Sequence, residues 1–450
     1  MTKRITILGA GESGIGSAIL AKKLGYNVFV SDKGSIAKEY KNELLEMELD
    51  FEENQHSDFQ ILESEIIVKS PGIPDSAAIV QKAKEKGIEI ISEPEFASRH
   101  YNGEIIAITG TNGKTTTTLL TYHLLKEAGL NVGLAGNVGI SFARQVATEV
   151  FDIYVLEISS FQLDGIVDFK PNIAVLLNIT PDHLDRYDGV LQNYIKSKFR
   201  LIKNLDRASH FIYNFDDDTI KSNYKEGQQF FNWPISLKVD NKAAFIVNEK
   251  KIGFDCHGEY HLDLRESPLI GKHNVYNTMA AFIAARLCGL NWEVIERGLK
   301  TFKNAEHRLE EVAVIDGIKF INDSKATNVD STFYALEGLS APIIWIAGGV
   351  DKGNDYKVLK PFTEKVKALL CLGLKNSKLK TAFKSKIDKI EEFDNVNKVV
   401  KRAYKMAKNG DTVLLSPACA SFDLFKNYID RGDQFKKAVH ELRKKELSAK

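Results

Sequence analysis

Short apolar runs alternate with longer amphipathic stretches along the whole chain, and this pattern constrains the fold more than any other feature. Each run is continuously apolar and is followed by a polar or turn-forming residue, which predicts strands covered on both faces. Such strands belong to parallel sheets flanked by helices, so we expect an α/β fold. The predicted strands are Ile5–Leu8, Val28–Val30, Ile66–Val68, Ile105–Thr109, Tyr154–Leu156, Ala174–Leu177, Ile343–Ala347, Ala368–Leu372 and Val413–Leu415.

Charge and composition exclude several classes of protein. The 61 Lys and Arg residues against 60 Asp and Glu residues give a net charge of +1, whereas proteins that coat nucleic acid are usually strongly basic. No apolar run approaches the ~18 residues of a membrane span. The four cysteines form no CxxC pair, which favours reduced thiols. We therefore expect a cytoplasmic protein that binds neither nucleic acid nor membrane. We also expect a monomer, although nothing in the composition determines the oligomeric state.

The most specific motif is a phosphate loop between a strand and a helix. Thr109–Thr116 reads TGTNGKTT, and it separates the strand Ile105–Ile108 from an amphipathic stretch. A glycine turn in this place lets backbone N–H groups surround a polyphosphate. Lys114 would add a positive charge at the β- and γ-phosphates, and the Thr115 hydroxyl would bind Mg²⁺.

A phosphate loop requires an acid at the end of a neighbouring strand to hold magnesium. Glu157 ends the next such strand, and His183 follows the strand Ala174–Leu177. A neutral imidazole could complete a Mg²⁺ or Mn²⁺ site, although magnesium usually prefers oxygen. Each of the two residues alone is as well explained as a solvated loop residue, so the prediction depends on the phosphate loop.

A second phosphate-binding pattern lies at the start of the chain. Gly9–Gly14 reads GAGESG directly after the first strand, and Asp32 follows the second strand. This is the dinucleotide-binding fingerprint in its proper context. It predicts an NAD-type cofactor or another nucleotide diphosphate, and the motif does not distinguish them.

Three polar loops follow apolar strands in the last third of the chain. They are Asn322–Asn328, Gly348–Gly353 and Ser416–Asp423. Ligands of open α/β sheets bind at the carboxyl ends of the strands, so Lys325 and Lys352 are candidates to hold a carboxylate or a phosphate.

Taken together, these residues resemble the Mur ligase family of ATP-dependent amino-acid ligases in peptidoglycan synthesis. The resemblance covers essentially the whole chain in order. It rests on the short motifs Gly110–Thr115, Gly136–Gly139, Glu157–Leu163, Asp182–Asp185, Gly271–Asn274 with Asn277, His307–Arg308 and Asn322–Asn328. Ser70–Gly72 and the run from Ser416 to Gly432 most resemble the members that add D-glutamate to UDP-N-acetylmuramoyl-L-alanine.

The resemblance implies three domains, at residues 1–99, 100–304 and 305–450. The first would be Rossmann-like and hold the UDP end of the substrate rather than NAD. The second would be an ATP-binding domain with a mainly parallel sheet, and the third a Rossmann-like domain that binds the amino acid. Within the second, we expect a strand-rich excursion between Asn214 and Asp263 and a helical stretch over Asn274–Lys300.

The resemblance also implies the site residues. Lys114, His183 and Lys198 would be catalytic, and Lys198 would be an N-carbamate that turns a cationic side chain into an anionic metal ligand. Two Mg²⁺ sites would use Thr115, Glu157, His183 and Lys198. ATP would contact Gly110, Thr111, Asn112, Gly113, Lys114, Thr115, Thr116, Asn274, Asn277, Arg308, Asp323 and Lys325. The UDP-linked substrate and the incoming glutamate would contact Gly11, Ser13, Gly14, Asp32, Ser70, Gly72, Asn137, Gln162, Lys325, Thr327, Lys352, Ser421, Phe422 and Tyr428, the last in place of an expected Phe.

Two alternatives stay open on the sequence. One is a Mur-type or folylpolyglutamate synthetase-like ligase with another amino-acid specificity, which a change of amine donor would reveal. The other is an NAD-binding regulatory protein or dehydrogenase with a phosphate-loop module, which NAD binding at Gly9–Gly14 would reveal. A binding module without catalysis is disfavoured, because it has no use for a magnesium acid and a phosphate lysine.

Overall fold

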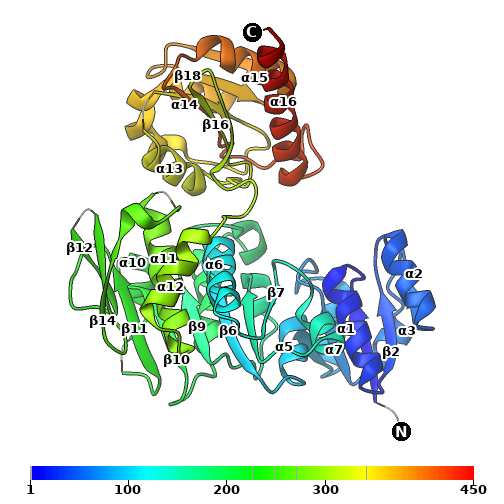
Figure 1. Ribbon diagram of the computed structural model, residues 1–450. Helices are drawn as coiled ribbons and strands as arrows, with labels where there is room; N and C mark the ends of the chain where they lie inside the picture. The colour runs from blue at the N-terminus through cyan, green and yellow to red at the C-terminus, as the bar shows by residue number, and fades with distance from the viewer. Residues whose placement is uncertain (1–2, 226, 249, 270, 341, 450) are drawn as a thin grey trace. The chain divides into compact units, whose positions relative to one another are not determined.

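The computed structural model describes residues 3–225, 227–248, 250–269, 271–340 and 342–449, and it contains three sheets. The chain divides into two compact units (Figure 1). The first unit comprises residues 1–268 and 276–302, and the second comprises residues 269–275 and 303–450.

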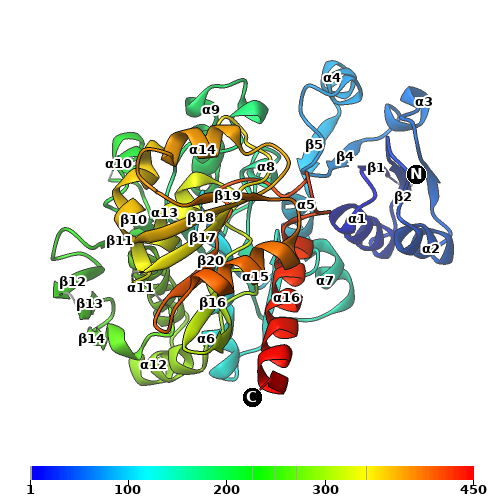
Figure 2. The same cartoon turned by 90° about the horizontal axis from the view of Figure 1, so that it is seen from above.

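The first sheet of the first unit has five parallel strands in the order β3-β2-β1-β4-β5. Figure 2 shows α1 and α4 on opposite sides of this sheet. Ile15 and Ala18 of α1 pack in one core with Ile7, while Ile79 of α4 packs with Leu8 in the other. The elements are β1 (Arg4–Leu8), α1 (Glu12–Lys23), β2 (Asn27–Ser31), α2 (Lys38–Glu46), β3 (Asp50–Glu52), α3 (Asp58–Ile61), β4 (Ile66–Lys69), α4 (Ala78–Glu85), β5 (Glu89–Ser92) and α5 (Glu93–Ser98).

The second sheet of the first unit has nine strands in the order β14-β13-β12-β11-β10-β9-β6-β8-β7. Strands β6 to β12 pair in parallel, and β12, β13 and β14 pair antiparallel. The strands are β6 (Glu104–Thr109), β7 (Val132–Gly136), β8 (Ile153–Glu157), β9 (Ile173–Leu176), β10 (His210–Asn214), β11 (Phe231–Ser236), β12 (Ala244–Asn248), β13 (Lys251–Asp255) and β14 (Glu259–Asp263).

Helices cover this sheet, and α6, α11 and α12 lie together on it (Figure 1). Gly298 of α12 lets Leu124 of α6 approach, since a Cβ at Gly298 would lie 2.8 Å from its Cδ2. The helices are α6 (Lys114–Glu127), α7 (Phe142–Thr148), α8 (Ser160–Leu163), η1 (Leu184–Tyr187), α9 (Leu191–Phe199), η2 (Arg200–Ile202), α10 (Asp218–Asn223), η3 (Leu264–Glu266), α11 (Lys272–Leu287) and α12 (Trp292–Thr301).

The sheet of the second unit has six strands in the order β15-β16-β20-β17-β18-β19, antiparallel only between β15 and β16. One face packs against α15 and α16, and the other packs against α13, α14 and η4 (Figure 2). The elements are β15 (Glu310–Ile315), β16 (Ile318–Asn322), α13 (Val329–Gly338), β17 (Ile343–Ala347), η4 (Tyr356–Lys365), β18 (Val366–Leu372), α14 (Ser377–Phe383), β19 (Ile390–Phe393), α15 (Val396–Met406), β20 (Thr412–Leu415) and α16 (Tyr428–Ala449).

The structure confirms the α/β class and the nine predicted strands, and the excursion between Asn214 and Asp263 holds β11 to β14. The helical stretch over Asn274–Lys300 is confirmed, and it consists of two helices, α11 and α12. Gly289 takes a left-handed φ of +88° after α11, and the Asn291 side chain accepts the Val294 N–H at the start of α12. The domain boundaries stay a prediction, because the first two sheets lie in one compact unit.

Across the described residues, no helix is both long and apolar enough to cross a membrane. The four cysteines carry free thiols.

Candidate active site

The phosphate loop has the geometry that the sequence predicts. Gly113 caps α6 with a left-handed φ of +86°, and a Cβ there would lie 2.4 Å from Asn277 Oδ1. Only glycine fits this position without strain. The Lys114 ammonium folds back over the loop and donates to the carbonyls of Gly110 at 2.8 Å and Thr111 at 2.7 Å. The Lys114 ammonium and the N-terminal end of α6 therefore lie at the same turn, and both suit a phosphate.

Asn178, two residues after the end of β9, fixes this loop. Its Oδ1 accepts the Asn112 backbone N–H at 2.8 Å, its Nδ2 donates to the Asn112 carbonyl at 3.0 Å, and its own carbonyl accepts the Thr111 N–H at 2.9 Å. The Thr111 hydroxyl lies 3.0 Å from Tyr194 Oη. Two neighbouring strands, β6 and β9, thus set the loop geometry.

Glu157 is the buried last residue of β8, beside β6. The Asn137 side chain donates to Glu157 Oε1 at 2.6 Å, and the Asn137 backbone N–H donates to the Glu157 carbonyl at 2.8 Å. The structure therefore brings together Asn137 and Glu157, which the sequence assigned to substrate and metal. Thr115 and Thr116 follow Lys114 in the first turn of α6, and both are buried.

Lys198 lies on α9 and is fully buried. Its Nζ donates to the Gly110 carbonyl at 2.9 Å and lies 4.8 Å from the centre of the Tyr194 ring. Burial holds the pKa of Lys198 well below its usual value, and the Lys114 charge lowers this pKa further. The interior therefore disfavours a bare ammonium at this position.

His183 stands in a loop of unusual backbone conformation. It takes a left-handed φ of +51°, and its N–H donates to the side chain of Asp182 at 2.9 Å. The ring packs edge-on against Phe161 of α8, with ring centres 5.1 Å apart. A strained non-glycine residue held by its neighbours is a feature often found at functional sites.

The N-terminal glycine turn is held by Asp32. The two carboxylate oxygens accept the N–H groups of Ala10 and Gly34, each at 2.7 Å. A Cβ at Gly14 would lie 1.8 Å from the Gly9 carbonyl, so the turn requires glycine there. Ser70 Oγ lies 3.4 Å from that same carbonyl, and Gly11 is the N-cap of α1, which Ser13 and Gly14 help to form. Five of the predicted substrate residues, Gly11, Ser13, Gly14, Asp32 and Ser70, thus lie around one turn.

Gln162 and the two asparagines of α11 have distinct surroundings. Gln162 completes a capping box with Ser159 at the start of α8. Asn277 lies beside Gly113 of the phosphate loop, in the first unit. Asn274 is buried and lies in the segment 269–275, which belongs to the second unit.

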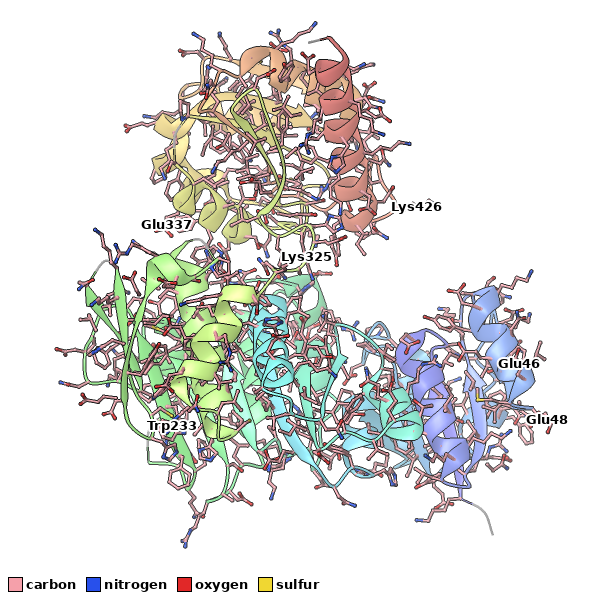
Figure 3. The ribbon with its side chains drawn as sticks, viewed as in Figure 1. Glu46, Glu48, Trp233, Lys325, Glu337 and Lys426 are labelled. Carbon is pink, nitrogen blue, oxygen red and sulfur yellow. The ribbon has the colours of Figure 1, made fainter. Side chains whose placement is uncertain are left out.

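In the second unit, β16, β17 and β20 pair in parallel and end at one sheet edge. Asp323 is buried there, accepts the Ser416 hydroxyl at 2.8 Å, and has its pKa raised by burial to about 7. Figure 3 labels Lys325 in the loop after β16. Its Nζ lies 5.4 Å from the centre of the Tyr428 ring, and the Thr327 N–H donates to its carbonyl.

The other second-unit residues differ in exposure. Ser421 is buried, the Phe422 side chain is 71% exposed, and Lys352 is exposed in the loop after β17. Arg308 lies two residues before β15 and is half-buried. The loops that carry Lys325, Lys352 and Ser421 all leave the same edge of the sheet, as the sequence predicts for the first two.

Three family descriptions match the chain in order. They are a Mur ligase MurD-like N-terminal domain over residues 3–92, the Mur ligase middle domain over residues 108–285 and a Mur ligase glutamate ligase domain over residues 307–419. A UDP-N-acetylmuramoylalanine–D-glutamate ligase of Christiangramia forsetii is 50% identical over 98% of this chain and 100% of its own. The chain belongs to the Mur ligase family.

A second relative and two solved structures are also similar to this chain. A protein of the same name from Cytophaga hutchinsonii is 49% identical over 98% of this chain and 100% of its own. A pseudomurein peptide ligase type C from Methanothermus fervidus has a TM-score of 0.62 at 19% identity, over 98% of this chain and 100% of its own. MurF ligase from Thermotoga maritima in complex with ADP has a TM-score of 0.61 at 15% identity, over 98% of both chains. The two solved structures show the fold.

The donor set of this Mur ligase fits Mg²⁺ in part. The Thr115 hydroxyl and the Glu157 carboxylate are the hard oxygen donors that Mg²⁺ prefers. Lys198 fits as a ligand only if its amine carries a carbamate, because an ammonium repels a cation and has no lone pair to donate.

Sequence reasoning missed Asn178 and Arg186, the second of which bonds to the loop around Gly72. The signal for Asn178 is its place directly after a strand that neighbours the phosphate loop. For Arg186 no signal exists, since an arginine in a polar loop is ordinarily solvated.

Proposed function

We propose that this Mur ligase joins D-glutamate to UDP-N-acetylmuramoyl-L-alanine in an ATP-dependent reaction of peptidoglycan precursor synthesis. The observation that carries the proposal is the meeting of Lys114 and Lys198 on the carbonyl of Gly110. This arrangement lies on a chain about 50% identical, over its whole length, to ligases named for that reaction.

The first step activates the carboxylate of the substrate's alanyl end. A carboxylate oxygen attacks the γ-phosphorus of ATP, and the bond between this phosphorus and the β–γ bridging oxygen breaks. The products are ADP and an acyl phosphate of the substrate. Lys114 would neutralise charge on the transferring phosphoryl group, and the N–H groups at the start of α6 would hold the phosphates. Bound Mg²⁺ supplies further positive charge at the phosphate oxygens.

The second step forms the amide. The amine of D-glutamate attacks the acyl carbon, a proton leaves the nitrogen, and inorganic phosphate departs from the tetrahedral intermediate. Lys325, Thr327, Lys352, Ser421, Phe422 and Tyr428 are the proposed glutamate contacts. Lysines suit this role because they offer point charges to the carboxylates of the incoming amino acid.

We also propose a carbamate on Lys198 and two Mg²⁺ sites formed by Thr115, Glu157, His183 and the carbamate. Full burial beside the Lys114 ammonium supports an anionic side chain there. Labelling with ¹³C-bicarbonate should give a carbamate carbon signal in the wild-type chain and none in Lys198→Arg. Equal spectra for the two chains would contradict the carbamate.

The glycine turn at Gly11 and Gly14, with Asp32, Ser70 and Gly72, would hold the UDP end of the substrate. A glycine turn at a helix N-terminus offers backbone N–H groups to a pyrophosphate. The proposal is supported by the positions of these residues, which follow the neighbouring parallel strands β1, β2 and β4. We further propose that the protein acts in the cytoplasm, which the free thiols at all four cysteines support. We also propose that it is a monomer.

The amine requirement tests the function. Purified protein receives ATP, Mg²⁺, bicarbonate and UDP-N-acetylmuramoyl-L-alanine, and phosphate release is followed with D-Glu, L-Glu, L-Lys, meso-diaminopimelate or L-Ala as the amine. We expect turnover with D-Glu alone. Turnover with another amine would overturn the specificity and keep the chemistry, and turnover with none would overturn the function.

A further inference from the structure

Arg186 connects two loops of the first unit that the proposed function uses for different purposes. It is a half-buried residue of η1, three positions after His183. Its guanidinium donates to three consecutive carbonyls of the loop after β4, those of Pro71 at 2.7 Å, Gly72 at 3.1 Å and Ile73 at 2.8 Å. A planar fork of donors is needed to hold three carbonyls at once.

The other side of the same guanidinium lies on an aromatic ring. Its central carbon is 4.4 Å from the centre of the Phe161 ring, a cation–π distance. Phe161 in turn meets the edge of His183, with ring centres 5.1 Å apart. Arg186 therefore touches the substrate loop directly and reaches His183 through one aromatic ring.

Both loops have further support, so Arg186 is not required merely to fold them. The Tyr187 hydroxyl donates to Asp164 Oδ2 at 3.0 Å and lies 3.2 Å from Ser197 Oγ, and these contacts also hold η1 in place. The Lys69 ammonium donates to the Ile73 carbonyl at 2.8 Å. Removal of Arg186 should therefore loosen the connection between the loops and leave the fold in place.

We propose that Arg186 is a positioning residue that couples the 70–73 loop, which would hold the UDP-linked substrate, to His183 at the metal site. The inference rests on the proposed function, because that function assigns the two loops their ligands. Substrate that orders the 70–73 loop would thereby favour the His183 orientation, so substrate and Mg²⁺ would each strengthen the binding of the other.

Two variants separate the two contacts of Arg186. Arg186→Lys keeps the charge but loses the planar fork, and Phe161→Leu keeps the carbonyl bonds but loses the ring between Arg186 and His183. For Arg186→Lys we expect KM for the UDP-linked substrate and half-saturating Mg²⁺ both to rise, by about tenfold and fivefold. For Phe161→Leu we expect only half-saturating Mg²⁺ to rise, and in both variants KM for ATP should change less than about twofold.

Arg286 offers a matched control. It donates to the carbonyls of Leu290 at 2.9 Å and His257 at 2.6 Å, and its guanidinium lies 5.5 Å from the centre of the Trp292 ring. Arg286→Lys thus loses the same kind of contact in the last turn of α11, nine residues after Asn277, which lies beside the phosphate loop. We expect this variant to keep all three constants within about twofold of wild type.

Hydrogen exchange gives a readout that does not depend on turnover. In Arg186→Lys, the N–H groups of Ile73, Arg186 and Gly189, which donate to Ser70, His183 and Leu184, should all exchange faster. Faster exchange in only one of the two loops would overturn the coupling. A Phe161→Leu variant in which KM for the UDP-linked substrate rises as much as half-saturating Mg²⁺ would also overturn it. Absent turnover in the wild-type chain would overturn the proposed function instead, and the exchange comparison would still decide the coupling.

Discussion

At the residue scale, Lys114 carries the largest predicted effect on chemistry. Its ammonium is held over the phosphate loop by the carbonyls of Gly110 and Thr111. Lys114→Ala should lower kcat by at least about 100-fold, because a charge that stabilises a phosphoryl-transfer transition state contributes several kcal/mol. Single-turnover ADP formation measures this, and a chain with near-normal ADP formation would show that Lys114 is not part of the reaction.

Glu93 should make the free energy of unfolding depend on pH. This buried carboxyl accepts the Ser141 hydroxyl and the Ala143 N–H, both at 2.7 Å, and burial raises its pKa to about 7. Between pH 4.5 and 7 the folded chain holds a proton that the unfolded chain has lost. The protonated group therefore favours the folded state at low pH, and this contribution is lost as the pH rises through 7.

Glu93→Gln removes this titration while keeping an acceptor oxygen. Between pH 4.5 and pH 8 the Glu93 titration should lower the free energy of unfolding of the wild-type chain by about 3 kcal/mol, and the variant should not show this loss. Denaturant midpoints of both chains at these two pH values measure the difference. Parallel pH profiles for the two chains would show that Glu93 titrates alike in the folded and unfolded states.

At the element scale, α6 begins and ends with a left-handed glycine, and the two ends provide a matched pair. A Cβ at Gly113 would lie 2.4 Å from Asn277 Oδ1, whereas a Cβ at Gly129 would meet nothing within 4 Å. Both alanine variants should lose about 1–2 kcal/mol of stability through backbone strain. Only Gly113→Ala should also weaken ATP binding, by about tenfold, because it displaces the loop.

Isothermal titration with a non-hydrolysable ATP analogue measures this difference. Equal affinities for the two variants would mean that the space at Gly113 is not needed for the nucleotide.

Helices α11 and α12 show what sequence periodicity leaves open. The pattern from Asn274 to Lys300 predicts a helical stretch and does not say whether it is one helix or two. The chain turns at Gly289, with φ +88°, and restarts behind the cap of Asn291. Glycine inside a helical pattern is compatible with both outcomes. The second helix packs against α6, where Gly298 lets Leu124 approach, and such a contact between distant segments cannot be read from local periodicity.

For the whole molecule, the sequence predicts best what depends on neighbours along the chain. The buried strands, the phosphate loop and Glu157 at the end of β8 all follow from local patterns, and the structure confirms these placements. The contacts of Arg186 with the loop at Gly72 join residues 114 positions apart. No local periodicity encodes such a contact, because it depends on how two sheets pack.

The transfer of oxygen from substrate to phosphate tests the central claim most directly. UDP-N-acetylmuramoyl-L-alanine labelled with ¹⁸O in its free carboxylate is turned over with ATP and D-glutamate, and the released phosphate is analysed by mass spectrometry. An acyl phosphate intermediate predicts one ¹⁸O atom in each phosphate released. Product formation with unlabelled phosphate would contradict activation of the carboxylate by phosphorylation, and with it the chemistry assigned to Lys114 and its loop.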